Sequence, residues 1–369
     1  MRIIPFFPYP QLFTSDEEPL LEVMRDVCGR GAFILQQECR ALELALASFL
    51  GVRHVFGVAN GTDAILIGLK AAGIGPGDEV ILPSHTYIAT AAAVHWVGAV
   101  PVLAECGSDH MLDAKDIEHR ITPRTRAIMP VHINGRTCDM AAIQAIADEH
   151  HLIVCEDAAQ ALGSRFGERH AGTFGAFGTF SFYPAKLLGC FGDGGAIATN
   201  DDAIAAQIKL LRDHGRNDEG KVVAWGLNSR LDNLQAAVLL HKFKTYPQDI
   251  ERRRAIAQRY QHHLGGMSEL QLPPAPDPQS PHFDVYQNYE LQADQRDALR
   301  EYLMAKGVRT IIQWAGTPVH QFKELGFTDR LPRTEKFFER CFMLPMNMAL
   351  TNDDVDYICD CIKIFYASP

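Results

Sequence analysis

The stretch Phe177–Thr199, FGTFSFYPAKLLGCFGDGGAIAT, indicates the fold more strongly than any other part of the chain. A β-patterned run, Thr179–Tyr183, leads to Lys186, and the glycine-rich run Gly189–Gly195 follows. A lysine in so apolar a stretch is expected to be partly desolvated, which lowers its pKa and frees its amine as a nucleophile. The alternative is an ordinary lysine whose ammonium group reaches water past a buried stem. Ser181 is either a phosphate ligand or a strand hydroxyl.

A second segment, Val154–Ser164, places two carboxylates at the end of a buried strand. Glu156 and Asp157 follow the apolar run, where open α/β sheets bind their ligands. An acid at this position often only caps the next helix. With Gln160 nearby, it is also suited to pairing with a protonated ring nitrogen while the amide contacts a neighbouring oxygen.

A third segment, Gly57–Ala64 (GVANGTDA), joins a strand to a helix. Gly61 and Thr62 open that helix, whose free N–H groups and dipole suit a phosphate. The alternative is a capped turn without a ligand. Tyr87, in SHTYIAT after another strand, is suited to stacking on a flat ring or to packing in the core.

Between residues 54 and 200, short β-rich runs alternate with helical patterns, which predicts a largely parallel sheet with helices on both faces. The run Leu272–Pro281 (LPPAPDPQSP) cannot continue a helix or a central strand, so we expect a connection near a domain boundary. The predicted strands are His54–Ala59, Glu79–Leu82, Arg126–His132, Leu152–Cys155 and Val285–Leu291, and the predicted helices are Thr62–Ala72, Ile88–Val97, Met140–His150, Gln295–Lys306 and one from Thr351.

Composition excludes several classes of protein. The 369 residues correspond to about two domains, and the net charge of −10 argues against nucleic-acid or anionic-membrane partners. The longest weakly polar stretch, Ile88–Ala104, is too short to span a bilayer, and the proline-broken N-terminus does not resemble a signal peptide. Nine scattered cysteines without a CxxC pair predict reduced thiols in the cytoplasm and no metal site.

Nicotinamide binding is disfavoured by the position of the glycines. Gly73, Gly75 and Gly77 lie between a helix and a strand, whereas the dinucleotide fingerprint lies between a strand and a helix. A lysine, an acid and a phosphate-binding helix end instead match the needs of pyridoxal phosphate (PLP).

The chain resembles the DegT/StrS-type sugar aminotransferases over nearly its whole length. The segments NGTDA, GIGPGDEVILPSHTYIAT, PVHINGRTCDM, EDAAQALGS, SFYPAKLLGCFGDGGAIATND, LRDHG and GLNSRLDNLQAA occur in that family's order. The resemblance implies the α/β fold type I of PLP enzymes: a mostly parallel seven-stranded sheet flanked by helices, and a smaller C-terminal α+β domain. We expect the large domain to span residues 1–245 and the small domain residues 246–369.

The resemblance also implies roles at the cofactor. Lys186 would form the Schiff base, Asp157 would pair with the pyridinium nitrogen, Gln160 would contact the ring hydroxyl, and Tyr87 would stack on the ring. Asn228 would reach the phosphate in a neighbouring subunit, making the homodimer obligatory. Out of that context, Asn228 and Arg230 are merely loop and surface residues. The phosphate would be held by Gly61, Thr62 and Ser181.

The segments that face the sugar depart from the family pattern. Asn134 replaces a common tyrosine, Gln36 a glycine and Gln287 a histidine, while Gln313 and Trp314 replace a His-Tyr pair. These departures leave the cofactor residues intact and bear on the choice of sugar. The residues predicted to bind substrate are Phe33, Tyr183, Arg230, Gln287, Gln313, Trp314 and His320.

The expected activity is transfer of an amino group from glutamate to a nucleotide-linked keto sugar, for a surface polysaccharide such as O-antigen or for a glycosylated metabolite. SFYPAKLLGCFGDGGA and NGTDAI look like the branch acting on dTDP- or UDP-linked 3-keto hexoses. A 4-keto sugar is the first alternative. A PLP-dependent sugar dehydratase would carry histidine at Lys186, and a non-catalytic homologue would not need the intact lysine, acid and phosphate set.

Overall fold

A seven-stranded sheet forms the centre of the computed structural model, which describes residues 2–367. Its strand order is β1-β9-β8-β5-β4-β2-β3. Strand β9 is antiparallel to its neighbours β1 and β8, and every pairing from β8 to β3 is parallel. The expected mostly parallel α/β sheet is therefore confirmed. Its strands are β1 (His54–Val58), β2 (Glu79–Pro83), β3 (Val100–Ala104), β4 (Thr125–Ile128), β5 (Ile153–Asp157), β8 (Phe177–Ser181) and β9 (Gly195–Thr199).

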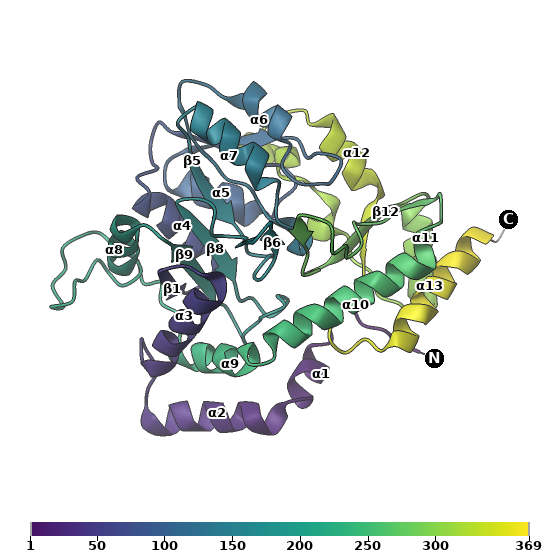
Figure 1. The fold of residues 1–369 in the computed structure, drawn as a ribbon, viewed down its shortest axis with the longest axis horizontal. Helices are drawn as coiled ribbons and strands as arrows, with labels where there is room; N and C mark the ends of the chain where they lie inside the picture. Colours follow the sequence, from purple (N-terminus) through teal and green to yellow (C-terminus); the bar gives the residue numbers. More distant parts are fainter. Residues whose placement is uncertain (1, 368–369) are drawn as a thin grey trace.

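Helices cover both faces of this sheet (Figure 1). Because side chains alternate along a strand, Leu82 packs in the apolar cluster beneath α4, α5 and α8, while Ile81 packs in the cluster on the opposite face with α6 and α7. A third cluster joins α3 and α9 to β8 and β9. The helices are α1 (Tyr9–Thr14), α2 (Glu17–Arg30), α3 (Gln37–Leu50), α4 (Gly61–Ala71), α5 (Ile88–Trp96), α6 (Ala114–Arg120), α7 (Met140–Glu149), α8 (Asp202–Leu211) and α9 (Asn233–Phe243).

The helix α10 (Tyr246–Leu264) runs from α9 toward the C-terminal elements (Figure 1), which have an apolar cluster of their own. That cluster packs α10, α11 (Arg296–Ala305) and α13 (Asn352–Ala367) on an antiparallel three-stranded sheet. The sheet has the order β10-β12-β13, and Ile4 from the N-terminal segment packs in the same cluster. A separate core agrees with two domains, but the boundary at residues 245 and 246 stays a prediction, because Tyr246 and Ile250 still pack in the large-domain cluster. The sheet strands are β10 (Leu270–Gln271), β12 (Tyr289–Ala293) and β13 (Cys341–Leu344), and α12 spans Pro332–Arg340.

The proline-rich connection ends against the large domain, where the N–H of Gly167 donates to the carbonyl of Pro281 at 2.7 Å. Strand β11 (His282–Phe283), just after this connection, pairs with β6 (Arg165–Phe166), which in turn pairs with β7 (Arg169–His170).

Among the described residues, none of the helices combines the length and apolar character that crossing a bilayer requires.

Two strand predictions need correction. The predicted strand Arg126–His132 ends at Ile128, because Pro130 has no N–H to donate to a ladder; beyond it Val131 forms only an isolated bridge with Asp157. The predicted strand Val285–Leu291 begins only at Tyr289, because Tyr286 has a φ of +50° and interrupts the extended backbone.

A close backbone approach joins β8 to the turn before it. A Cβ on Gly178 would lie 2.2 Å from both the Cα and the carbonyl oxygen of Gly172. Backbone atoms cannot move aside as a flexible side chain can, so only glycine fits at residue 178.

We therefore expect Gly178→Ala to lower the free energy of unfolding by roughly 3 kcal/mol, since the turn must move away from the sheet. Urea denaturation measures the loss. The control is Gly29→Ala in α2, where an added Cβ meets nothing within 4 Å, and stability should stay equal or rise by up to about 1 kcal/mol. Equal stability of the Gly178→Ala and wild-type proteins would contradict this account.

Candidate active site

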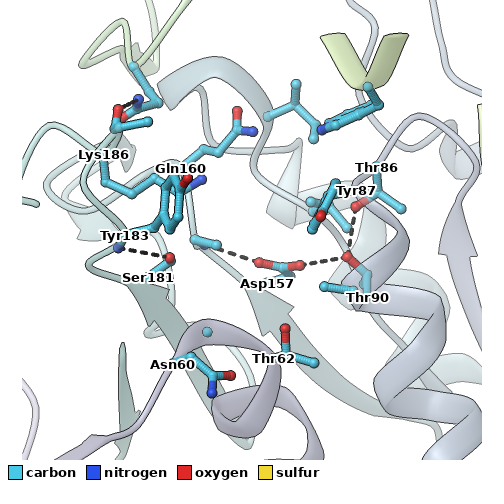
Figure 2. A pocket seen from close by; sticks show the side chains of 18 of the residues that line it. Asn60, Thr62, Thr86, Tyr87, Thr90, Asp157, Gln160, Ser181, Tyr183 and Lys186 are labelled. Atoms are coloured by element: carbon cyan, nitrogen blue, oxygen red, sulfur yellow. Dashed lines mark hydrogen bonds between the residues drawn. The ribbon is translucent and has the colours of Figure 1, made fainter. Parts of the chain in front are cut away.

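A cavity of about 790 Å³ opens where β5 and β8 end and α4 and α5 begin. Its size is that of a typical small-molecule site. Most of the residues predicted from the sequence line it: Gly61, Thr62, Tyr87, Asp157, Gln160, Ser181, Tyr183, Lys186, Gln287, Gln313 and Trp314. Figure 2 shows the part of the cavity around Asp157 and Lys186.

Asp157, the last residue of β5, is held in place through both carboxylate oxygens. Its Oδ2 accepts a 2.8 Å hydrogen bond from Thr90 Oγ1, and its Oδ1 accepts from the N–H of Ala159 at 3.1 Å (Figure 2). Because Thr90 gives its only hydroxyl proton to the carboxylate, Thr86 must donate in the 2.7 Å contact between the two threonines. Asp157 is 4% exposed, and these two hydrogen bonds fix its carboxylate at the wall of the cavity.

Lys186 lies across the cavity from Asp157, on the loop after β8 (Figure 2). Burial lowers the pKa of its amine to about 8, and the negative charge of Asp157 partly opposes that shift. At pH 7 about a tenth of the amine is therefore neutral, far more than for a lysine with the ordinary pKa of 10.5, and the neutral form is what a nucleophile or a proton acceptor requires.

The start of α4 provides an anion-binding cup. The Asn60 side chain caps the helix by accepting from the N–H of Asp63 at 2.8 Å. Within residues 2–367, no acceptor reaches the N–H groups of Gly61 and Thr62, so they can bind a ligand. A Cβ on Gly61 would lie 3.0 Å from the Ser181 Cβ, so glycine leaves the space between α4 and Ser181 open.

Gln287 holds the loop that carries Lys186. Its Oε1 accepts from the N–H of Leu187 at 2.7 Å, and its Nε2 donates to the carbonyl of Ala185 at 2.8 Å. These contacts fix the backbone on both sides of the lysine. The resemblance suggested a substrate contact for Gln287, which stays a prediction; in the structure its amide positions the loop of Lys186.

Four predicted residues lie outside the lining of the cavity. His320 is 1% exposed and bonds through Nδ1 to Ser84 Oγ at 2.7 Å and through Nε2 to Glu335 at 3.1 Å. The other three are at the surface or in a surface loop. Phe33 is 51% exposed, Asn228 is exposed, and Arg230 forms a 2.9 Å ion pair with Asp213.

The sequence reasoning missed several residues that complete the site. Thr86 lies just before the N-cap of α5 and Thr90 in its first turn, and their hydroxyls are 2.7 Å apart. In the sheet, β2 lies beside β4 and β4 beside β5, so the segment that follows β2 lies near the end of β5. Its two threonines were therefore the available sequence signal for partners of Asp157. The residues missed are Asn60, Thr86, Thr90 and Asn288.

This set of residues fits pyridoxal phosphate. The cofactor needs an amine for its aldehyde, an acid for its ring nitrogen and N–H and hydroxyl donors for its phosphate. Lys186, Asp157 and the cup at Gly61, Thr62 and Ser181 supply these groups around one cavity. Among the described residues, no cluster of histidine, cysteine or acidic side chains is suited to a metal ion.

Known proteins show the same combination of sequence and fold. The profile of the DegT/DnrJ/EryC1/StrS aminotransferase family matches residues 14–363. The chain is 38% identical to the dTDP-3-amino-3,4,6-trideoxy-alpha-D-glucose transaminase of Streptomyces venezuelae, over 97% of this chain and 96% of that protein. It is also 38% identical to the UDP-N-acetyl-3-dehydro-alpha-D-glucosamine 3-aminotransferase of Acidithiobacillus ferrooxidans, over 98% and 97% of the two chains.

Solved structures confirm the architecture. The crystal structure of S. venezuelae DesV in complex with a ketimine intermediate superposes with a TM-score of 0.95 at 36% identity, and the match covers 100% of both chains. The predicted fold class is therefore that of an enzyme whose crystal structure contains a reaction intermediate.

The pKa of Lys186 predicts how its reactivity depends on pH. In the cofactor-free protein, acetylation of Lys186 by acetic anhydride should rise with pH and reach half its maximum near pH 8, because only the neutral amine reacts. Mass spectrometry of the peptide that contains Lys186 measures this. Asp157→Asn should move the midpoint below 8, since the lost negative charge no longer favours the ammonium form. A midpoint at the ordinary lysine value of 10.5 would contradict the desolvation argument.

Proposed function

Since the chain belongs to the DegT/DnrJ/EryC1/StrS aminotransferase family, we propose that it transfers an amino group from glutamate to C3 of a nucleotide-linked 3-keto hexose. The enzyme is a PLP-dependent aminotransferase. The arrangement of Lys186, Asp157 and the α4 cup around one cavity is the observation that carries the proposal. The two relatives named above act on dTDP- and UDP-linked sugars at C3, which supports this choice over a 4-keto sugar.

When bound, pyridoxal phosphate supplies an electron sink for the bond that breaks at the Cα of the amino donor. We assign the binding of its phosphate to the N–H groups of Gly61 and Thr62 and the hydroxyl of Ser181. The Asp157 carboxylate would keep the ring nitrogen protonated, and Tyr87, the N-cap residue of α5, would contact the ring.

Lys186 has two roles in this scheme. Its amine would hold the cofactor between turnovers, and as a free amine Nζ would accept the proton from the donor Cα and later give it up again. A pKa near 8 suits both directions, because Nζ can accept and return a proton close to neutral pH. The Gln287 contacts keep Nζ within reach by fixing the loop backbone. In the second half-reaction the same proton movements run in reverse on the sugar.

The reverse reaction tests the function. The PLP-loaded protein is incubated with 2-oxoglutarate and with paired 3-amino and 4-amino hexoses linked to dTDP or UDP, and glutamate is measured. We expect only a 3-amino sugar to be consumed, and Lys186→Ala to lower the rate by at least about a thousandfold while circular dichroism stays unchanged. Consumption of only 4-amino sugars would overturn the regiochemistry; glutamate from neither would overturn the function.

We further propose a homodimer with shared active sites. The loop that carries Asn228 and Arg230 is rich in exposed apolar side chains, with Trp225 98% and Val222 69% exposed. An apolar loop of this kind favours contact with another protein surface. In a two-fold dimer it would complete the phosphate site of the partner.

Mixed dimers test that arrangement. Lys186→Ala and Asn228→Ala chains are co-expressed and the heterodimer is purified through two different tags. One of its two sites then combines an intact Lys186 with an intact Asn228, so activity should exceed that of either variant alone. Activity no higher than the average of the two separate variants would show that each site is built within one chain.

We also place the reaction in the cytoplasm and its product in a surface polysaccharide or a glycosylated metabolite. All nine cysteines carry free thiols, and eight of them are buried. Burial raises the pKa of Cys39 and Cys190 to about 12 and that of Cys106 to about 11, so these thiols stay protonated. This use of cysteine is typical of proteins from a reducing compartment.

A further inference from the structure

Asn134 connects the cofactor end of the cavity to its far wall. Its backbone N–H donates to Gln160 Oε1 at 2.8 Å, and its side chain lies between Glu290, Gln313 and Asn288. The residue has a φ of +58°, a conformation that asparagine adopts more readily than most residues. Asn134 therefore contacts two of the amide side chains that line the cavity, Gln160 and Gln313.

Glu290 determines which way the Asn134 amide faces. Glu290 is 2% exposed, and its Oε2 accepts from Asn134 Nδ2 at 2.7 Å. The same oxygen lies 3.4 Å from Nε2 of His85, whose Nδ1 bonds to the carbonyl of His110 at 2.9 Å. A carboxylate only accepts hydrogen bonds, so Asn134 must turn its NH₂ group toward Glu290 and its oxygen away.

The orientation of Asn134 in turn sets that of Gln313. Asn134 Oδ1 accepts from Gln313 Nε2 at 2.5 Å and from Asn288 Nδ2 at 3.0 Å. Gln313 uses its NH₂ group in this contact, and no donor within residues 2–367 reaches its Oε1. Because Gln313 lines the cavity, that oxygen is available to a ligand there.

Gln160 is oriented the opposite way. Its Oε1 accepts from the N–H of Asn134 and, at 3.3 Å, from Asn288 Nδ2. Its NH₂ group is then the part left for the cavity, as a donor. The network thus presents a donor at the cofactor end of the cavity and an acceptor at the far end.

Resting on the proposed function, we propose that Glu290 and Asn134 are positioning residues that hold Gln313 Oε1 as a hydrogen-bond acceptor for the sugar. The sugar must then carry a hydroxyl or an amide N–H opposite Gln313 Oε1. A sugar whose group at that point is only an acceptor, or whose carbon there carries only hydrogen, binds less well. Selection arises because a buried polar group left unpaired costs more than the bond itself contributes.

Equilibrium binding tests the proposal without turnover. Calorimetry on the PLP-loaded protein compares UDP-N-acetylglucosamine with UDP, and dTDP-glucose with dTDP, so that the sugar's own contribution is isolated. For whichever sugar contributes in the wild type, Glu290→Leu should weaken nucleotide-sugar binding about tenfold, since one hydrogen bond is lost, and leave the diphosphate unchanged. Glu290→Gln keeps an oxygen for Asn134 and should restore affinity to within about threefold.

Two further variants separate positioning from general damage. Gln292 lies two residues along β12 on the same side of the strand, and it bonds to Gln271 and to the His110 ring but to neither Asn134 nor Gln313. Gln292→Leu should bind the sugar normally. Gln313→Met should weaken binding as Glu290→Leu does, and the double variant should be no weaker than either single variant.

Failure of this proposal can be told apart from failure of the proposed function, because the binding experiment needs no turnover and the reverse reaction measures turnover separately. No sugar contribution in the wild type, an unchanged affinity in Glu290→Leu, or fully additive losses in the double variant would each overturn the proposal. We expect the affinity losses of Glu290→Leu and Gln313→Met to be non-additive and Glu290→Gln to restore affinity, whether or not a 3-keto sugar is the substrate.

Discussion

The buried carboxylate of Glu156 is the constraint on which the site depends. It is 0% exposed and accepts hydrogen bonds from the N–H groups of Gly172, Phe174 and Gly175 and from Nε2 of His132, which lies 2.9 Å away. His132 Nδ1 accepts from the N–H of Cys138 at 3.1 Å, so its proton lies on Nε2, facing the acid. A charge this deep is tolerated only when fully paired.

That pairing holds the end of the central strand. Glu156 and Asp157 are adjacent on β5, so their side chains point to opposite faces of the sheet. Glu156 anchors the turn at residues 172–175 on one side, and this anchoring keeps Asp157 facing the cavity on the other. The glycine contact between residues 172 and 178 completes the fit, because only a bare backbone lets the turn lie this close to β8.

Much of this could be predicted from the sequence, and the failures have physical causes. Strand and helix alternation predicted the parallel sheet, and the motifs around Lys186 and Asp157 placed both at strand ends. Local patterns could not show that Tyr286 takes a positive φ, or that His320 is committed to Ser84 and Glu335, since both depend on distant neighbours. The amide network at Asn134 joins residues up to 179 positions apart, and no spacing rule indicates such contacts.

The Gln287 clamp also has a consequence for the order in which the chain is made. Leu187 and Gln287 are separated by 100 residues, and Gln287 belongs to the segment that leads into the small sheet. On the ribosome, at about 5–20 residues per second, the loop around Lys186 emerges at least several seconds before its clamp exists. The large sheet can therefore form early, while the catalytic loop becomes rigid only after the C-terminal part has been synthesised and has docked.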